Sequence, residues 1–413
     1  MSDVTATKAK TATKAPPATP MAAPDRLGAV PAAERLAEAL GRGDHVRLVN
    51  APDGYDALAL AALAKRLAQQ EGERSVTLLH LSRDGQRCQR LADALAFVAP
   101  QIETLVLPAW DCQPYDRVSP NAGIAADRML ALSRLATAKA TTDRPRLLLT
   151  TVNAMLQRVP TKARIAADSF SARPGNALDL NKLASWLETN GYLRAGVVRD
   201  IGDYAVRGGI LDLWPSTHSE PVRLDFFGDT LESIRSFDAE TQRSTGQLHS
   251  IDLVPLSEVR LTSENIKRFR TAYVTRFGAP GPDDALYEAI SEGRRYPGLE
   301  HWMPLFHDRL DTLFELAGGA PVVLDYLAQE AAHERIAQIA DYQKARLTAL
   351  DGKTAGGAPY RPLPPDALYL TEEEFGERLS RLGVVRLTPF AEAGGEAAGI
   401  FDAKAHKGRS FAP

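Results

Sequence analysis

The loop at residues 50–58 (NAPDGYDAL) lies where a phosphate-binding loop would do its chemistry, between a short apolar strand and a helix. At this position of a βαβ unit, backbone N–H groups and a helix N-terminus point toward the ligand. A phosphate loop needs G-x-x-x-x-G-K-[ST], in which lysine pairs with the phosphates and a hydroxyl holds magnesium. The loop offers Gly54 without that lysine or hydroxyl, and Asp53 and Asp56 would repel phosphate. We interpret Asn50, Asp53, Gly54 and Asp56 as a degenerate loop, a helix-start turn with an aspartate cap that binds no cofactor.

Other residue types that carry catalysis or bind metals are sparse. The sequence has no HExxH or GxSxG motif, and Cys88 and Cys112 form no C-x-x-C pair. We interpret His301 and His307 as a partly buried surface pair. The acidic run at 372–374 is typical of a solvated first helical turn, where negative charge suits the helix dipole. We therefore predict no catalytic residue and no metal site.

An aromatic residue and two arginines suggest a protein-binding surface instead. In the segment PVRLDFFGD (221–229), alternate side chains of a strand face opposite ways, so Arg223 and Phe227 share the polar face. Phe227 gains nothing from folding there, and aromatic and arginine side chains are favoured interface types. Arg207 precedes Gly208 and Gly209, a pair that we expect to form a bulge and to aim Arg207 at the same patch.

A simpler interpretation of this surface stays open. Arg207 and Arg223 could merely pair with Asp225 or Asp229 on a solvated face of the sheet. Ion pairs of this kind are common on exposed sheet faces and need no binding partner.

The order of the elements predicts an α/β fold with an insertion. Helical and strand patterns alternate from about residue 32, which indicates a parallel sheet, whereas the segments after Pro160 read as antiparallel hairpins. We predict a disordered tail (1–27), a discontinuous α/β domain (28–159 and 247–350), an inserted small α+β domain (160–246), a linker (351–365), a small α/β segment (366–392) and a second linker (393–413).

Composition limits the class of protein. Hydrophobic residues make up 44% and charged residues 24% of the 413 residues, as in globular proteins. The 49 basic residues are balanced by 52 acidic ones, which excludes a nucleic-acid protein that works by sheer basicity. Two cysteines favour a reducing cytoplasm, and no apolar run approaches the ~20 residues of a membrane span.

Four segments together carry a resemblance to a known family: LPAWDCQPYDRVSP, VNAMLQRV, GYLRAGVVRDIGDYAVRGGILDLWP and VRLDFFGDTLESIRSFDAETQR. The chain from about residue 28 to 390 resembles the N-terminal UvrB-homology module of Mfd, the bacterial transcription-repair coupling factor. The resemblance implies a RecA/UvrB-like parallel-sheet domain that has lost its ATP site. It also implies an inserted domain that binds UvrA through Arg207, Arg223 and Phe227. Full-length members continue into domains that bind RNA polymerase and DNA and use ATP and magnesium; we expect these to be missing here.

The sequence thus predicts a non-catalytic recruitment module that brings nucleotide excision repair to stalled RNA polymerase. One alternative is an ATP-dependent, helicase-like nucleic-acid-binding enzyme with an unrecognised nucleotide site, which would require ATP to stabilise the folded chain. Another is weak DNA binding by scattered arginines, which would show steep salt dependence.

Overall fold

The computed structural model describes residues 30, 32–69, 77–137, 145–351, 360–392 and 399–406. The tail predicted at 1–27 lies outside the described residues, as do 352–359 of the first predicted linker and 393–398 and 407–413 of the second.

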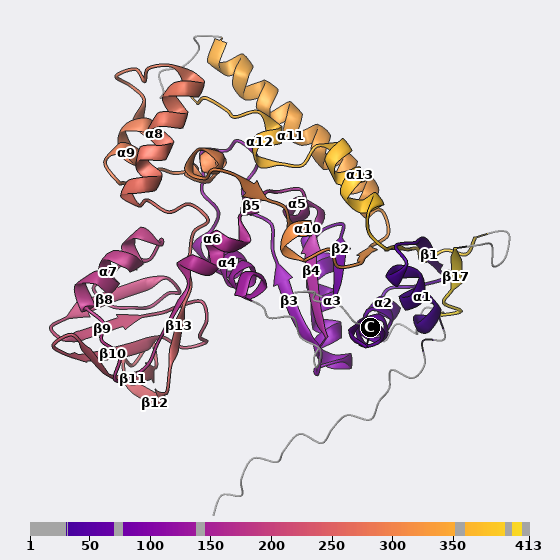
Figure 1. Cartoon of the computed structure of the whole chain (residues 1–413), viewed down its shortest axis with the longest axis horizontal. Helices are drawn as coiled ribbons and strands as arrows, with labels where there is room; N and C mark the ends of the chain where they lie inside the picture. Colours follow the sequence, from indigo (N-terminus) through magenta and orange to yellow (C-terminus); the bar gives the residue numbers. More distant parts are fainter. Residues whose placement is uncertain are drawn as a thin grey trace, which may run out of the picture.

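A seven-stranded parallel sheet forms the centre of the larger domain (Figure 1). Its strand order is β17-β1-β16-β15-β2-β4-β3. The strands are β1 (His45–Val49), β2 (Leu78–Ser82), β3 (Glu103–Leu107), β4 (Arg146–Thr151), β15 (Val322–Leu324), β16 (Val384–Leu387) and β17 (Ile400–Asp402). β2 and β4 are buried along their whole length, as apolar runs in a parallel sheet must be when helices cover both faces. The predicted α/β class is confirmed.

Helices cover both faces of this sheet and give it two hydrophobic cores. On one face pack α1 (Ala33–Gly41), α2 (Tyr55–Ala68) and α3 (Gly85–Val98). On the other pack α4 (Ala122–Thr137), α5 (Val152–Met155), α6 (Lys162–Asp168), α10 (Leu313–Leu316), α11 (Ala328–Asp351) and α13 (Glu372–Ser380). Leu78 of β2 packs in the core beneath α1, α2 and α3. Leu79 and Leu81 pack in the core on the opposite face of the sheet.

The C-terminal segment belongs to this sheet, which corrects the predicted boundaries. β16, from the segment expected at 366–392, lies between β1 and β15, and β17, from the linker expected at 393–413, pairs with β1. Val384 and Val385 are fully buried because one faces each core. The described end of the linker expected at 351–365 also packs, through Tyr360 and Leu363. α12 (Pro365–Leu368) follows directly.

The inserted domain is a six-stranded sheet in the order β12-β11-β10-β9-β8-β7, with α7 (Leu180–Thr189) packed on its apolar face. Its strands are β7 (Leu193–Arg194), β8 (Asp203–Arg207), β9 (Ile210–Leu213), β10 (Val222–Phe227), β11 (Thr230–Phe237) and β12 (Ser244–Leu248). All neighbours pair antiparallel except β7 and β8. The boundary expected at 246 falls inside β12, and β13 (Ile251–Leu253) still pairs with β6 (Phe170–Ala172). The insertion therefore extends past the predicted boundary.

A small helical layer completes the fold beside α11 (Figure 1). It contains α8 (Ser263–Phe277), α9 (Ala285–Ser291) and the 3₁₀ helix η2 (Leu299–Phe306), and the two-stranded pairing of β5 (Val159–Pro160) with β14 (Leu310–Asp311) lies next to it. His301 of η2 is buried between Trp110 and Tyr115, which corrects the expected surface position of this histidine. Neither of its ring nitrogens has a hydrogen-bond partner.

Burial of His301 predicts acid sensitivity. Desolvation lowers its pKa from the ordinary 6.5 to about 4, so between these values the unfolded chain takes up a proton that the folded chain does not. Above pH 6.5 His301 is neutral in both states and does not lower the free energy of unfolding. As pH falls from 6.5 toward 4, protonation of His301 in the unfolded chain lowers the free energy of unfolding. Between pH 7 and pH 5, a His301→Phe variant is expected to lose about 2 kcal/mol less free energy of unfolding than the unmodified chain. Urea titrations at both pH values measure this difference. An exposed histidine, changed in His333→Ala, is the control, and equal losses in His301→Phe and the unmodified chain would contradict the assignment.

Candidate protein-binding face of the inserted domain

The face of the inserted sheet that points away from α7 carries all three predicted binding residues. Residues paired across antiparallel strands share a face, and Arg223 stands opposite Asp212, which stands opposite Ala205. Side chains an even number of residues apart in a strand share a face. Arg207 therefore lies on the same face as Ala205, and Phe227 lies on the same face as Arg223. The structure thus brings Arg207, Arg223 and Phe227 together on one side of the sheet.

Phe227 is a strongly exposed aromatic residue of this face. Its relative exposure is 76%, whereas its neighbour Phe226 packs against the core of the domain. The register of β10 and β11 shifts between Asp225 and Phe226, so the ladder is irregular just before the exposed ring. The ring stands at the end of its strand, next to the turn that contains Gly228.

Arg207 is exposed at the end of β8, and its Nη2 donates to the carbonyl oxygen of Gly196 at 2.9 Å. The two glycines that follow form the tight turn between β8 and β9, because Arg207 pairs with Ile210. The bulge expected at Gly208 and Gly209 is therefore wrong. Gly208 has a φ of 60°, and a Cβ on Gly209 would lie 2.9 Å from the carbonyl oxygen of Phe226, so this turn requires glycine for conformation and for space.

Arg223 is less available than the other two residues. Its Nε and Nη2 donate to the two carboxylate oxygens of buried Asp212 at 2.7 and 2.9 Å, and its guanidinium lies 4.8 Å from the ring centre of Phe237. The side chain is 17% exposed. The hydrogen bonds to Asp212 raise the pKa of Arg223, so its charge is permanent. A guanidinium has five N–H donors, and those not bound to Asp212 remain for a partner.

The ion pairs of this face differ from those that the sequence suggested. Asp225 binds Arg235, with N···O distances from 2.8 to 3.1 Å, and not Arg207 or Arg223. Arg235 lies directly opposite Arg223 across the strand pair and is 42% exposed. The sequence interpretation therefore missed two residues of the site, Asp212 and Arg235. Asp212 lies between two core leucines of one strand, and that was the signal for a charge on the opposite face.

The polar groups of the degenerate loop are engaged in hydrogen bonds within the protein. Asn50 donates to Asp402 of β17 at 2.8 Å, and Gly54 is the N-cap of α2. The buried carboxylate of Asp56 accepts hydrogen bonds from the backbone N–H groups of Gly54 and Ala57, both at 2.9 Å. The aspartate N-cap that we expected is therefore wrong: the N-cap is Gly54, and Asp56 is the second residue of the helix.

A buried arginine of α3 links this loop to Asp325, which directly follows β15. Arg87 of α3 donates to Asp56 at 2.6 Å and to both oxygens of Asp325 at 3.3 Å, and its Nη1 lies 3.2 Å from the more exposed Asp53. Burial raises the pKa of Asp56 although Arg87 opposes this shift. The backbone donors that would face a phosphate are therefore occupied by an internal carboxylate, and that carboxylate is matched by an internal cation.

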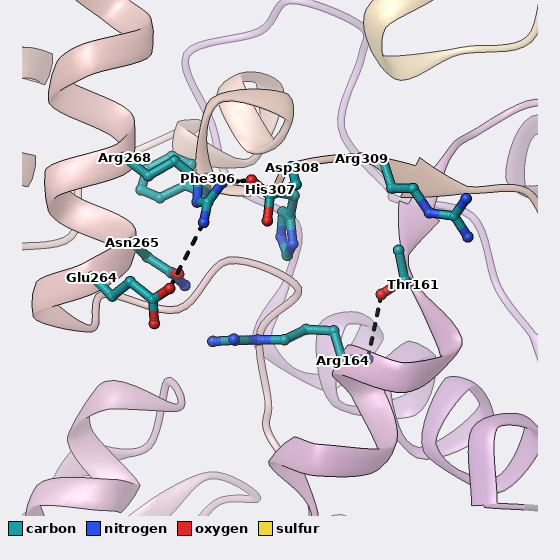
Figure 2. A pocket seen from close by; sticks show the side chains of 9 residues that line it. All are labelled: Thr161, Arg164, Glu264, Asn265, Arg268, Phe306, His307, Asp308 and Arg309. Carbon is teal, nitrogen blue, oxygen red and sulfur yellow. Dashed lines mark hydrogen bonds and ion pairs between the residues drawn. The ribbon is translucent and has the colours of Figure 1, made fainter.

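A cavity of about 310 Å³ lies between α6, α8 and the segment after η2 (Figure 2). Arg164 and His307 project into it from opposite sides. Its three arginines are all paired: Arg164 with Asp168, Arg309 with Asp311, and Arg268 with Glu264 and Asp308. Because each cation already has a carboxylate, the cavity has no charge excess that would select an anionic ligand.

The residues that the structure describes contain neither a cluster of metal-binding side chains nor a helix that could span a membrane. Within the described ranges, no group of three or more His, Cys, Asp or Glu side chains could hold a metal ion. No helix in the part of the chain that the structure describes is long and apolar enough to cross a membrane.

Comparison with known proteins supports the resemblance noted in the sequence. Residues 170–258 match the UvrB interaction domain, a range that contains Arg207, Arg223 and Phe227. Over 338 residues the chain is 32% identical to the transcription-repair-coupling factor of Haemophilus influenzae, covering 81% of this chain and 28% of that protein. The corresponding protein of Rickettsia bellii is 33% identical over 74% of this chain, and that of Escherichia coli is 29% identical over 79%. The chain spans about a quarter of the length of these relatives. The chain is thus similar to transcription-repair-coupling factors over about three quarters of its own length, and its residues 170–258 match the UvrB interaction domain.

Proposed function

We propose that this chain is a non-catalytic recruitment module of a transcription-repair-coupling factor, acting in the bacterial cytoplasm. In this proposal the inserted domain binds UvrA through Arg207, Arg223 and Phe227 and so brings excision repair to stalled RNA polymerase. Contacts with RNA polymerase and DNA, and the use of ATP and magnesium, are assigned to the rest of such a protein, about three quarters of the length of its relatives.

The observation that carries the proposal is the exposure of Phe227 beside Arg207, inside the segment that matches the UvrB interaction domain. A large aromatic ring held in water contributes little to folding, whereas buried against a partner it supplies apolar contact area. Arginines around it steer and orient an acidic partner.

The non-catalytic part of the proposal draws support from the loop at 50–58. Asp56 accepts the backbone hydrogen bonds of this turn and Arg87 neutralises it, so a nucleotide phosphate would have to displace a buried ion pair. This cost disfavours the alternative of an ATP-dependent, helicase-like enzyme.

The test is a titration of UvrA with single variants. Phe227→Ala and Arg207→Ala are each expected to weaken binding at least about thirtyfold, the consequence of losing about 2 kcal/mol at a central contact. Neither change should lower the melting temperature by much, because both side chains are exposed and the hydrogen bond that Arg207 gives to the carbonyl oxygen of Gly196 lies at the surface.

The matched control is Phe97→Ala on α3, which removes a phenyl ring that is 82% exposed and lies far along the chain from the inserted domain. It should leave UvrA affinity unchanged. If Phe227→Ala and Arg207→Ala also bind UvrA as the unmodified chain does, this face is not the docking site.

A further inference from the structure

The segment from Leu193 to residue 201 places further apolar side chains in water next to Arg207. Leu193 is 60% exposed, and Val197 and Ile201 are each 38% exposed. Scattered exposed apolar residues are ordinary on a protein surface, but neighbouring ones that adjoin an aromatic ring and arginines are typical of binding surfaces.

This segment lies on the same face of the sheet as Phe227. Leu193 stands opposite Asp203 in the parallel pairing of β7 with β8, and Asp203 alternates onto the face of Ala205 and Arg207. Val198 is fully buried against Ala205 and Phe237, two residues of that face. The loop at 195–201 therefore packs on this face of the sheet and does not project from its edge into solvent.

Several contacts hold the loop in place. Val198 anchors it from below, and Arg207 donates to the carbonyl oxygen of Gly196. Gln242 donates to the carbonyl oxygen of Val198 at 3.2 Å, and the backbone N–H of Arg199 donates to Asp203 at 3.1 Å. Because the loop is ordered before any partner arrives, binding to it costs little conformational entropy.

The charges beside the loop define the partner. The carboxylates of Asp212 and Asp225 are bound to Arg223 and Arg235 within the face. What the face and its loop present outward is therefore the guanidinium groups of Arg207 and Arg199, the exposed part of Arg235 and one loop carboxylate, that of Asp200, with Phe227 and the loop's apolar groups around them, so that cations are in excess. A surface of this kind fits carboxylates that surround an apolar patch.

We propose that the loop at 195–201, together with Leu193, is the second half of the docking surface, and that its occupant is an acidic protein surface with an apolar centre. Val197 and Ile201 contact that apolar centre, while Arg207 and Arg235 face its carboxylates. This inference rests on the proposed function, since it extends the same face, but it can fail independently of it.

The experiment titrates purified UvrA with two double variants of the intact chain, Val197→Asp/Ile201→Asp and Val197→Lys/Ile201→Lys. Both remove the apolar contact, but aspartates add repulsion toward an acidic partner and lysines add attraction. We expect the aspartate variant to weaken binding at least about tenfold and the lysine variant to weaken it clearly less. The two double variants should have similar melting temperatures to each other, because both replace the same partly exposed side chains with charged ones and leave Val198 and the hydrogen bonds that anchor the loop untouched.

Phe227→Ala and a Phe97→Asp variant complete the design. If Phe227→Ala weakens binding and the loop variants do not, the loop lies outside the interface and this inference fails while the proposed function stands. If aspartates and lysines weaken binding equally, the partner surface is not acidic. If none of the variants, Phe227→Ala included, changes affinity, the proposed function fails and the inference fails with it.

Discussion

Replacing Arg87 with methionine is expected to lower the free energy of unfolding by about 3 to 5 kcal/mol. The guanidinium is buried and forms ion pairs with the carboxylates of Asp56 and Asp325, whose side chains are 3% and 2% exposed. Methionine fills much of the same space but leaves two buried charges without their cation. Burial already raises the pKa of Asp56, and loss of Arg87 raises it further.

The size of this loss should depend on pH, with a definite sign. In the variant the folded-state pKa of Asp56 lies above its unfolded value, so the folded protein binds a proton that the unfolded chain has released. The penalty is then smaller near pH 5 than near pH 8. Denaturant titrations at both pH values measure it.

Arg83→Met is the matched control, because Arg83 and its partner Asp84 are both exposed and such pairs contribute between about 0 and 1 kcal/mol. In the triple variant Arg87→Met/Asp56→Asn/Asp325→Asn the buried charges are gone, and much of the stability should return. An Arg87→Met chain as stable as the Arg83→Met chain would show that the loop does not depend on this cation.

Replacing Arg223 with methionine is expected to destabilise the inserted domain by about 3 kcal/mol, unlike changes at Arg207 or Phe227. Asp212 is buried, and Arg223 supplies both of its hydrogen bonds. Methionine would keep an apolar contact with Phe237 but leave the carboxylate uncompensated. Thermal melting of the variant, followed together with UvrA binding, separates the two effects.

The double variant Arg223→Met/Asp212→Asn is the internal test of this prediction, because asparagine carries no charge. It should melt closer to the unmodified chain than Arg223→Met does, while any deficit in UvrA binding that comes from direct contact persists. A melting temperature of Arg223→Met equal to that of Arg207→Ala would contradict the structural role given to Arg223. The stability effect also means that Arg207 and Phe227 are the cleaner probes of binding.

Much of the fold follows from sequence periodicity. The helices of the first 140 residues and the strands between them were predicted from their apolar spacing, as was the change to hairpins after Pro160. Strand order was not predictable in the same way. The segment at 384–387 (VVRL) reads as a strand in isolation, but nothing local says that it lies between β1 and β15. The end of the insertion was missed because β12 (STGQL) has Leu248 as its only large apolar residue and so gives no alternation signal.

The candidate site was predicted in part for a similar reason. Alternation within one strand correctly placed Arg223 and Phe227 on one face, because that rule needs no knowledge of neighbours. Pairing across strands does need the register, so Asp212 was missed and Asp225 was expected in its place. The same holds for Arg87, whose partners lie 31 and 238 positions away in the sequence. Whether UvrA recognises this face stays a prediction.

The position of β1 has a consequence for how the protein is made. Its two neighbours in the sheet are β16 and β17, so a strand that leaves the ribosome early has no hydrogen-bonding partner until residues 384–402 have been synthesised. During that interval the nascent chain exposes both edges of an apolar strand, which favours association with other chains. Fragments that stop at residue 350 would keep this exposure permanently, so expression of the larger domain needs residues through β17.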